Sequence, residues 1–528
     1  MCNSIIKTNH NQITPIMSNT TENNKRIAKN TLLLYIRMLF TMIVSLYTSR
    51  VILNTLGVTD FGIYNVVGGV VAMFGFLNSA MSSSTQRFIT FELGKNDLNQ
   101  LQKVFNTSIV IHVIISIVIL ILAETFGLWF LYNKMTIPIE RLDAALWAYQ
   151  GAIASTIVLI MSVPYNATII AHEKMSAFAY IAVLEVTLKL LIAYLILIGN
   201  FDKLKLYAFL MFSIQLIIRF IYGQYCKKHF LETKIKKIKD WKLFKEMLGF
   251  ASWSLWGNLA VIAYTQGLNI LLNIFFTPAI NAARGVAVQV QNAVNQFSLN
   301  FQTALNPQIT KSYAIGDYKY MHKLVFRSSK FTFFLLLLLS LPILLETETI
   351  LTIWLKNVPE YTTNFLRLML CITIIDATAN PFMISASATG KVKVYQSLIG
   401  GILLLILPIS YITLKLGGSP ESVFIVHLLI CIIAFITRLL IIKPMIHLSI
   451  LSYFNEVVVK CIKVTIFALI IPISIKCLTE ESHINFFIIC LTAIISVILS
   501  IYYIGFDDKE KIFIKQKLIT IINKFHNL

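Results

Sequence analysis

Residues 49–96, SRVILNTLGVTDFGIYNVVGGVVAMFGFLNSAMSSSTQRFITFELGKN, predict two apolar helices joined by a short turn rich in Gly, Asp and Asn. Arg50 lies near the end of the first helix, and Arg87 lies at the end of the second. An arginine this close to hydrocarbon costs roughly 2.5 kcal/mol or more if it faces lipid. We therefore expect both arginines to face a watery, protein-lined cavity that is cationic at its edge.

The composition of the whole chain agrees with this expectation. Of its 528 residues, 57% are hydrophobic and 13% are charged, and the mean hydropathy is +0.75. These values lie far outside the range of soluble domains and predict a multi-spanning, all-α membrane protein. The longest polar interval between apolar segments, residues 227–247, is too short for a soluble domain. A membrane enzyme with a large catalytic loop is therefore disfavoured.

Apolar segments of roughly 20 residues each predict about fourteen membrane-spanning helices. Their approximate limits are 31–53, 63–85, 105–127, 144–166, 177–199, 205–225, 248–274, 279–304, 329–351, 362–386, 394–415, 421–442, 458–477 and 484–505. We expect the chain to divide into a disordered cytoplasmic tail (1–29), a six-helix lobe (30–226), a basic cytoplasmic linker (227–247), a second six-helix lobe (248–445), two extra helices (446–505) and a basic cytoplasmic tail (506–528).

The basic residues set the expected orientation. If the N-terminus is cytoplasmic, 32 of the 45 Lys and Arg residues, with Arg438 counted among them, fall on the inner side and 7 on the outer side. Such an excess indicates that the basic side, with both termini, is cytoplasmic. The net charge of +20 then reflects topology and attraction to anionic lipid, and we expect no nucleic-acid partner.

The chain also repeats itself. The segment PYNATIIAHEK, residues 164–174, matches PFMISASATGK, residues 381–391, in its Pro, aromatic, Ala and Lys positions. Six predicted helices separate the two segments, so the halves have the same orientation in the membrane. We expect parallel repeats about an axis along the membrane normal, with a central cavity between two six-helix lobes.

The segment from Asn54 to Tyr64, NTLGVTDFGIY, resembles the turn between the first two helices of polysaccharide flippases. That family belongs to the superfamily that also holds multidrug/toxin extruders and lipid II flippases. The resemblance implies a transporter without catalytic residues or cofactors. It would flip a polyprenyl-pyrophosphate-linked oligosaccharide across the bacterial inner membrane by alternating access, for O-antigen, lipopolysaccharide or capsule synthesis. Expected partners are the lipid-linked oligosaccharide, the bilayer and other polysaccharide-assembly proteins.

Arginines are the candidate ligands for the pyrophosphate. In lipid II flippases, arginines of the first, second and eighth helices surround the lipid phosphates, and the resemblance extends this role to Arg50, Arg87 and Arg284. Arg37 and Arg367 also lie within predicted spans, where arginines outnumber acids. A surplus of positive charge favours an anionic cargo.

The predicted helix 279–304 carries a polar stripe. At 100° per residue, Arg284, Gln291, Asn295 and Gln302 fall close to one line along this helix. Such amides either hydrogen-bond between neighbouring helices or face a glycan in a cavity. Both interpretations stay open for the amides, and Arg284 favours the cavity because a buried cation needs an anion or water. We name Gln291 and Asn295 as candidate glycan ligands.

Asp376 is the clearest acid inside a predicted span, five residues before Pro381. The proline loosens the helix and frees a carbonyl nearby, so this place is a candidate Na⁺ or H⁺ coupling site. Local polarity without ion binding is the alternative interpretation of Asp376.

Two other functions remain open for the whole chain. A multidrug/toxin extruder would have the same fold, although it typically has twelve helices and acidic cavity residues. A polysaccharide polymerase or glycosyltransferase would need a larger outer loop than residues 128–143.

Overall fold

The structure is a computed structural model that describes residues 20–72, 75–134, 137–197, 201–236, 240–276, 278–355, 357–479, 482–508 and 510–512. The side chains of some helical residues in these ranges, Arg50 among them, lie outside the description. Regular structure within the described ranges is entirely helical, as predicted.

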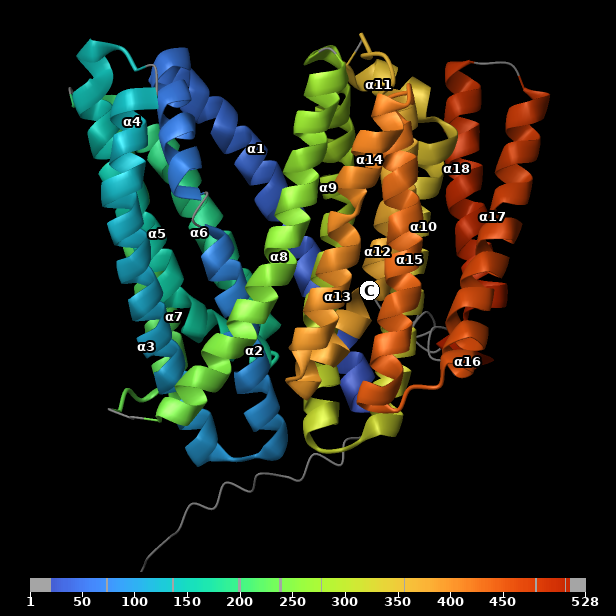
Figure 1. Cartoon of the computed structure of the whole chain (residues 1–528), viewed down its shortest axis with the longest axis horizontal. Coiled ribbons are helices and arrows are strands. Elements are labelled where there is room, and N and C mark those ends of the chain that lie inside the picture. The colour runs from blue at the N-terminus through green and yellow to red at the C-terminus, as the bar shows by residue number, and fades with distance from the viewer. Residues whose placement is uncertain are drawn as a thin grey trace, which may run out of the picture.

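The helices form two groups that stand side by side in Figure 1. The N-terminal group contains α1 (Thr20–Ala72), α2 (Gly75–Lys95), α3 (Leu98–Leu122), α4 (Leu128–Lys134), α5 (Leu142–Ala171), α6 (Met175–Leu195) and α7 (Lys203–His229). The C-terminal group contains α8 (Trp241–Phe275), α9 (Pro278–Ala314), α10 (Tyr318–Leu345), α11 (Thr347–Leu355), α12 (Thr362–Thr389), α13 (Val392–Leu404), α14 (Ile406–Lys415), α15 (Ser422–Ile446), α16 (Ile450–Tyr453), α17 (Val459–Leu478) and α18 (His483–Ser500). Short π or 3₁₀ turns lie at Ala123–Gly127, Ile139–Arg141, Leu231–Thr233, Phe454–Val458 and Ile501–Gly505.

Helix α1 consists of two legs that meet at Gly57. The backbone of Gly57 is non-helical, with φ 78° and ψ 167°, a region that is essentially restricted to glycine. Figure 1 shows the blue ribbon of α1 rising toward the upper end of the molecule and the chain then descending toward α2. The predicted turn between the first two helices is therefore a reversal at a single glycine.

Twelve helices among the described residues are long and apolar enough to span a membrane. The chain is thus a multi-pass membrane protein of the predicted all-α class. The predicted span 279–304 lies in α9 but is not among the twelve, because α9 is rich in Asn and Gln and carries Arg284. The predicted span 63–85 includes residues 73 and 74, which lie outside the described part of the chain.

Two predicted boundaries were wrong. Residues 20–29, assigned to a disordered tail, begin α1, while residues 1–19 lie outside the described part of the chain. The segment that joins the two lobes is shorter than the predicted linker 227–247, because α7 continues to His229 and α8 begins at Trp241.

The repeated segments adopt matching conformations. Pro164 lies inside α5 and Pro381 inside α12. Each helix ends at a turn with a left-handed residue, Glu173 (φ 58°) after α5 and Gly390 (φ 78°) after α12. The sequence repeat therefore corresponds to a repeat of local structure.

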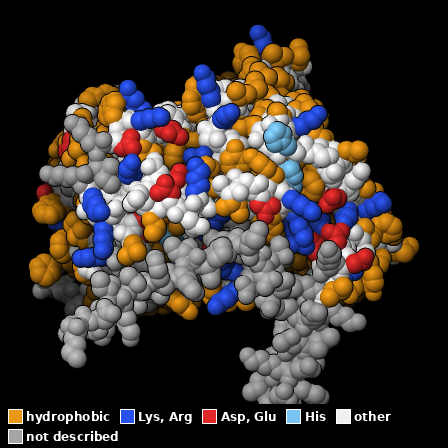
Figure 2. All heavy atoms as spheres, turned by 90° about the horizontal axis from the view of Figure 1, so that it is seen from below, with side chains coloured by type: hydrophobic (Ala, Val, Ile, Leu, Met, Phe, Trp, Pro, Cys, Tyr) orange, Lys and Arg blue, Asp and Glu red, His pale blue; other side chains and the backbone are white. Residues whose placement is uncertain are grey.

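The end of the molecule where α2 and α9 finish and α8 and α10 begin is here called the basic end. It is the lower end in Figure 1, and Figure 2 shows Lys and Arg side chains spread over it among fewer acids. Large buried aromatic side chains stabilise the C-terminal group above it. Phe382 packs 5.0 Å from Tyr453, and Phe365 packs 4.6 Å from Phe424, measured between ring centroids.

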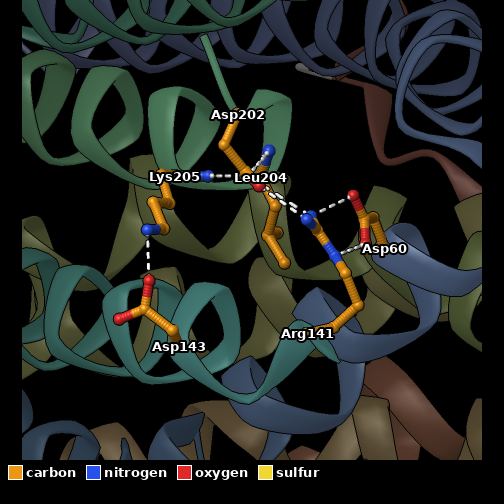
Figure 3. Close-up of polar contacts among 6 residues, drawn as sticks. All are labelled: Asp60, Arg141, Asp143, Asp202, Leu204 and Lys205. Atoms are coloured by element: carbon orange, nitrogen blue, oxygen red, sulfur yellow. Dashed lines mark hydrogen bonds and ion pairs between the residues drawn. The ribbon is translucent and has the colours of Figure 1, made fainter. Parts of the chain in front are cut away.

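At the opposite end, Arg141 ties three segments of the N-terminal group together (Figure 3). Its guanidinium donates to both carboxylate oxygens of Asp60 in α1, at 2.8 and 2.5 Å, and to Asp202 at 2.5 Å. Asp202 also caps α7 by accepting from the backbone N–H of Leu204. The second leg of α1, just past the Gly57 reversal, is thereby fixed to the start of α7.

Candidate functional site

The two groups of helices meet along a seam formed mainly by α1 and α2 of the N-terminal group and α8 and α9 of the C-terminal group. Arg37 of α1 donates from Nη2 to the side-chain oxygen of Asn300 on α9, at 2.9 Å. The same guanidinium stacks 4.6 Å from the ring centroid of Phe178. Its Nε is buried and has no hydrogen-bond partner among the described residues. Arg37 therefore lies at the seam with one N–H donor unpaired, and its hydrogen-bond partner is an amide and not a carboxylate.

Arg87 of α2 crosses the seam closer to the basic end. Its Nε and Nη2 donate to the carbonyl oxygens of Ser387 and Ala388, both at 3.0 Å, and it stacks 4.6 Å over Phe88 and over Phe91. These carbonyls belong to the last turn of α12, where a helix leaves acceptors unsatisfied and the macrodipole favours a cation. In this conformation Arg87 joins the two groups, and its guanidinium is occupied.

Glu173 forms a second crossing contact at the basic end. Its carboxylate is 1% exposed and accepts hydrogen bonds from Lys311 Nζ and Gln308 Nε2 of α9, both at 2.7 Å. It also forms an ion pair with Arg26 at 2.9 Å. Burial alone would raise the pKa of Glu173. The cations Lys311 and Arg26 and the hydrogen bonds outweigh burial, so the pKa lies below its ordinary value of 4.5.

The polar stripe of α9 divides among several neighbours. Arg284 is buried and donates to the side-chain oxygen of Asn269, and to the carbonyl of Thr265 at 3.0 Å. Gln291 donates to Thr373 of α12 at 2.8 Å. Gln302 donates to the carbonyl of Ala377, also in α12, at 3.0 Å, whereas Asn295 is half-buried. Gln291 and Gln302 therefore act as hydrogen-bonding residues between helices in this conformation.

Asp376 lies near the middle of α12 and forms an ion pair with Arg438 of α15. The distance from Oδ1 to Nη1 is 2.6 Å, and the side chains are 54% and 11% exposed. Counting Arg438 with the charges outside the membrane was wrong, because it lies inside α15 and is buried. A carboxylate at this depth with an exposed face needs water or a polar surrounding, since facing lipid is costly.

The structure thus separates the predicted site residues. Arg37 and Arg87 lie on the seam, whereas Arg284, Gln291, Asn295 and Asp376 lie in the C-terminal group. Arg50 is in the first leg of α1, and its side chain lies outside the description. Sequence reasoning missed Glu173 and Arg438. A lone arginine within the apolar α15 was the available signal for Arg438.

Comparison with solved structures identifies the fold. A MATE protein in its bent conformation superposes with a TM-score of 0.70 at 12% identity, covering 80% of this chain and 96% of that chain. The outward-facing conformation of a multidrug resistance MATE family transporter of the MOP superfamily superposes with a TM-score of 0.68 at 14% sequence identity. The match covers 80% of this chain and 96% of that chain. The chain has the MATE transporter fold. A MOP superfamily transporter from Pyrococcus furiosus superposes with a TM-score of 0.66 at 14% sequence identity, and the match again covers 80% of this chain and 96% of that chain. For that protein, reversed polarity of the binding pocket suggests a different function.

No family model matches the sequence, and no curated protein matches it. The likeness therefore rests on three-dimensional arrangement.

Proposed function

We propose that this chain is a membrane transporter that works by alternating access between its two groups of helices. The observation that carries the proposal is the seam. Bonds from Arg37, Arg87 and Glu173 join the groups in the half of the molecule nearest the basic end. In Figure 1 the groups diverge toward the opposite end. This arrangement supports a conformation closed at the basic end, which the charge distribution predicts to be cytoplasmic.

The charge of the interior supports an anionic cargo. Among the described residues, Arg37, Arg87 and Arg284 have amide or carbonyl partners and no carboxylate within 4 Å. The carboxylates of Asp376 and Glu185, which also lie within candidate spans, are already paired with Arg438 and Lys189. A lipid with a pyrophosphate would supply the missing anion, and planar guanidinium groups suit phosphate oxygens. Together with the resemblance of residues 54–64 to polysaccharide flippases, this favours a polyprenyl-pyrophosphate-linked oligosaccharide moved across a bacterial inner membrane.

The second candidate is a multidrug extruder. The likeness of fold favours it, because the solved proteins that superpose over 80% of this chain include a multidrug resistance MATE family transporter. Asp376, with its exposed face, would then offer a negative group to a cationic cargo or a coupling ion. In both candidates we assign coupling to a Na⁺ or H⁺ gradient to this carboxylate.

A reconstitution experiment separates the candidates. The full chain in proteoliposomes is given either a fluorescent lipid-linked oligosaccharide or a fluorescent organic cation, under an imposed Na⁺ or H⁺ gradient. We expect gradient-dependent transfer of the lipid-linked oligosaccharide. Transfer of the cation alone would establish the extruder, and transfer of neither cargo under either gradient would contradict the proposed function.

A further inference from the structure

A pocket of about 250 Å³ lies at the basic end, where α2, α8 and the turn between α12 and α13 meet. Lys245, Lys391 and Lys393 line it, together with one acid, Glu246. Phe88, Phe250 and Trp253 provide its aromatic wall. The arginines and the aspartate that the proposed function uses do not line this pocket, and of them Arg87 stacks on its Phe88 wall.

The lysines of this pocket form no ion pair with Glu246, the acid that lines it. Among the described residues, none of the three lysine ammonium groups pairs with a carboxylate within 4 Å. Lys393 Nζ lies 5.1 Å from the ring centroid of Trp253, and Lys245 Nζ lies 5.5 Å from that of Trp241. All three side chains are exposed, so the lining carries a net charge of +2 that solvent or a ligand must balance.

Lysines interleaved with Trp and Phe at the end of membrane helices match the chemistry of a lipid headgroup. Tryptophan rings settle at headgroup depth, and basic pockets between helices on the cytoplasmic side bind anionic headgroups. An isolated soluble anion would gain nothing from the aromatic wall, whereas the glycerol or acyl part of a lipid would cover it.

We propose that this pocket binds the phosphate of a lipid headgroup in the leaflet at the basic end. Lys245, Lys391 and Lys393 contact the phosphate, and Trp253 packs against the adjoining apolar part of the lipid. The proposal goes beyond the proposed function, because it requires no transport and holds for either cargo.

The pocket is also coupled to the seam. Phe88 of α2 forms one wall, and Gly390 of the turn after α12 forms another. Between them, Arg87 stacks on Phe88 and donates to the last carbonyls of α12. Both walls are present only while α2 is docked on α12. A bound headgroup therefore favours the conformation closed at the basic end, since a ligand shifts the equilibrium toward the state that binds it better.

The test measures lipid binding to the purified full chain by native mass spectrometry, without transport. The protein is delipidated in neutral detergent and titrated with phosphatidylglycerol, phosphatidylcholine, undecaprenyl phosphate or inorganic phosphate. Each lysine near an anionic headgroup contributes roughly fivefold in affinity. With three lysines and one opposing acid, we expect phosphatidylglycerol to bind at least tenfold more tightly than phosphatidylcholine. Tighter binding of undecaprenyl phosphate than of phosphatidylglycerol would support the pocket and identify the carrier lipid as its occupant.

The triple variant Lys245→Ala, Lys391→Ala, Lys393→Ala should reduce this preference to within twofold. The matched control, Lys103→Ala, Lys174→Ala, Lys319→Ala, removes the same charge from the basic end and should keep it. The triple Lys-to-Arg variant at the pocket positions preserves the positive charge, and should keep the preference even if the alanine variant does not fold. Three outcomes would overturn the proposal. A folded alanine variant could keep the preference for phosphatidylglycerol, the control could lose it equally, or the arginine variant could lose it. Binding of inorganic phosphate as tight as that of phosphatidylglycerol would overturn the assignment to a lipid.

Discussion

Glu173 and Gly390 occupy equivalent places 217 residues apart, each in a left-handed conformation just after a proline-containing helix. Each turn is contacted by a helix of the opposite group. Helix α9 supplies Lys311 and Gln308 to Glu173, and α2 supplies Arg87 to the carbonyls beside Gly390. A left-handed conformation costs a residue other than glycine about 1–2 kcal/mol. The ion pairs of Glu173 offset this cost, so the two crossing contacts close the basic end by different chemistry at related positions.

Replacing Glu173 by Gln should loosen the basic end. The amide keeps the shape of the side chain but loses the ion pairs with Lys311 and Arg26. Removing one partner of a fully buried ion pair destabilises the folded state by about 3–5 kcal/mol. We expect Glu173→Gln to lower the free energy of unfolding by about 2 kcal/mol, because both cations are partly exposed. Spin labels at Asn99 and Lys319, both exposed at this end, should report a larger population of long distances between the two groups.

The control for this variant is Glu232→Gln. Glu232 is also buried at the basic end, but its hydrogen bond with His172, at 2.6 Å, stays within the N-terminal group. The control should leave the distance distribution unchanged. An equal change in both variants would show that Glu173 stabilises the fold and does not hold the seam closed.

The pH dependence of this contact follows from the lowered pKa of Glu173. A carboxyl with a depressed pKa stabilises the folded state above its unfolded pKa, about 4.5, and the stabilisation is lost as the pH falls through the lower, folded value. The difference in Tm between the wild type and Glu173→Gln should therefore be constant from pH 6 to 8. It should shrink only below about pH 4.5. A difference that varies between pH 6 and 8 would assign the effect to another group.

Much of this fold is encoded in local sequence patterns, and for these parts of the fold the sequence was sufficient to predict the structure. Apolar length predicted most of the helices, and the sequence repeat at Pro164 and Pro381 corresponds to two helices that end in similar turns. The contacts across the seam could not be predicted. Arg87 binds backbone carbonyls some 300 residues away, and carbonyls leave no mark on a sequence. The pairing of Asp376 with Arg438 also required knowing that α12 and α15 are neighbours.

Replacing Gly57 by Ala should destabilise the reversal in α1. At φ 78° and ψ 167° an added Cβ is strained, even though no described atom beyond the chain neighbours of Gly57 lies within 4 Å of it. We expect a loss of about 1–3 kcal/mol. Gly62→Ala is the matched control, since Gly62 is helical and also has open space around it. Thermal unfolding in detergent measures both variants, and equal Tm values would refute the need for glycine at position 57.

Asp376 and Arg438 should show coupled effects on stability. Asp376→Asn leaves the buried guanidinium of Arg438 without its carboxylate, and Arg438→Gln leaves the carboxylate without its cation. Because Asp376 is half exposed, we expect each single change to cost about 1–3 kcal/mol and the double change to cost less than their sum. Additive losses would indicate that the ion pair contributes nothing. Unchanged gradient dependence of transport in a folded Asp376→Asn variant would remove the proposed coupling role.

Arg284 offers the sharpest test of cargo charge, because it is buried beside an amide and a carbonyl, with its Nε unpaired among the described residues. A hydrogen bond to a charged group contributes about 1.5–3 kcal/mol, so losing one to a phosphate lowers the kcat/KM of an anionic cargo roughly 10- to 100-fold. Arg284→Gln should show this loss for the lipid-linked oligosaccharide, and Arg284→Lys should retain part of the activity. Arg219→Gln is the matched control, since Arg219 lies in α7 and stacks on Tyr165 within the N-terminal group. If Arg284→Gln lowered the transfer of an organic cation as much as that of the anionic lipid, the arginine would be a structural residue and the anionic cargo would lose its main support.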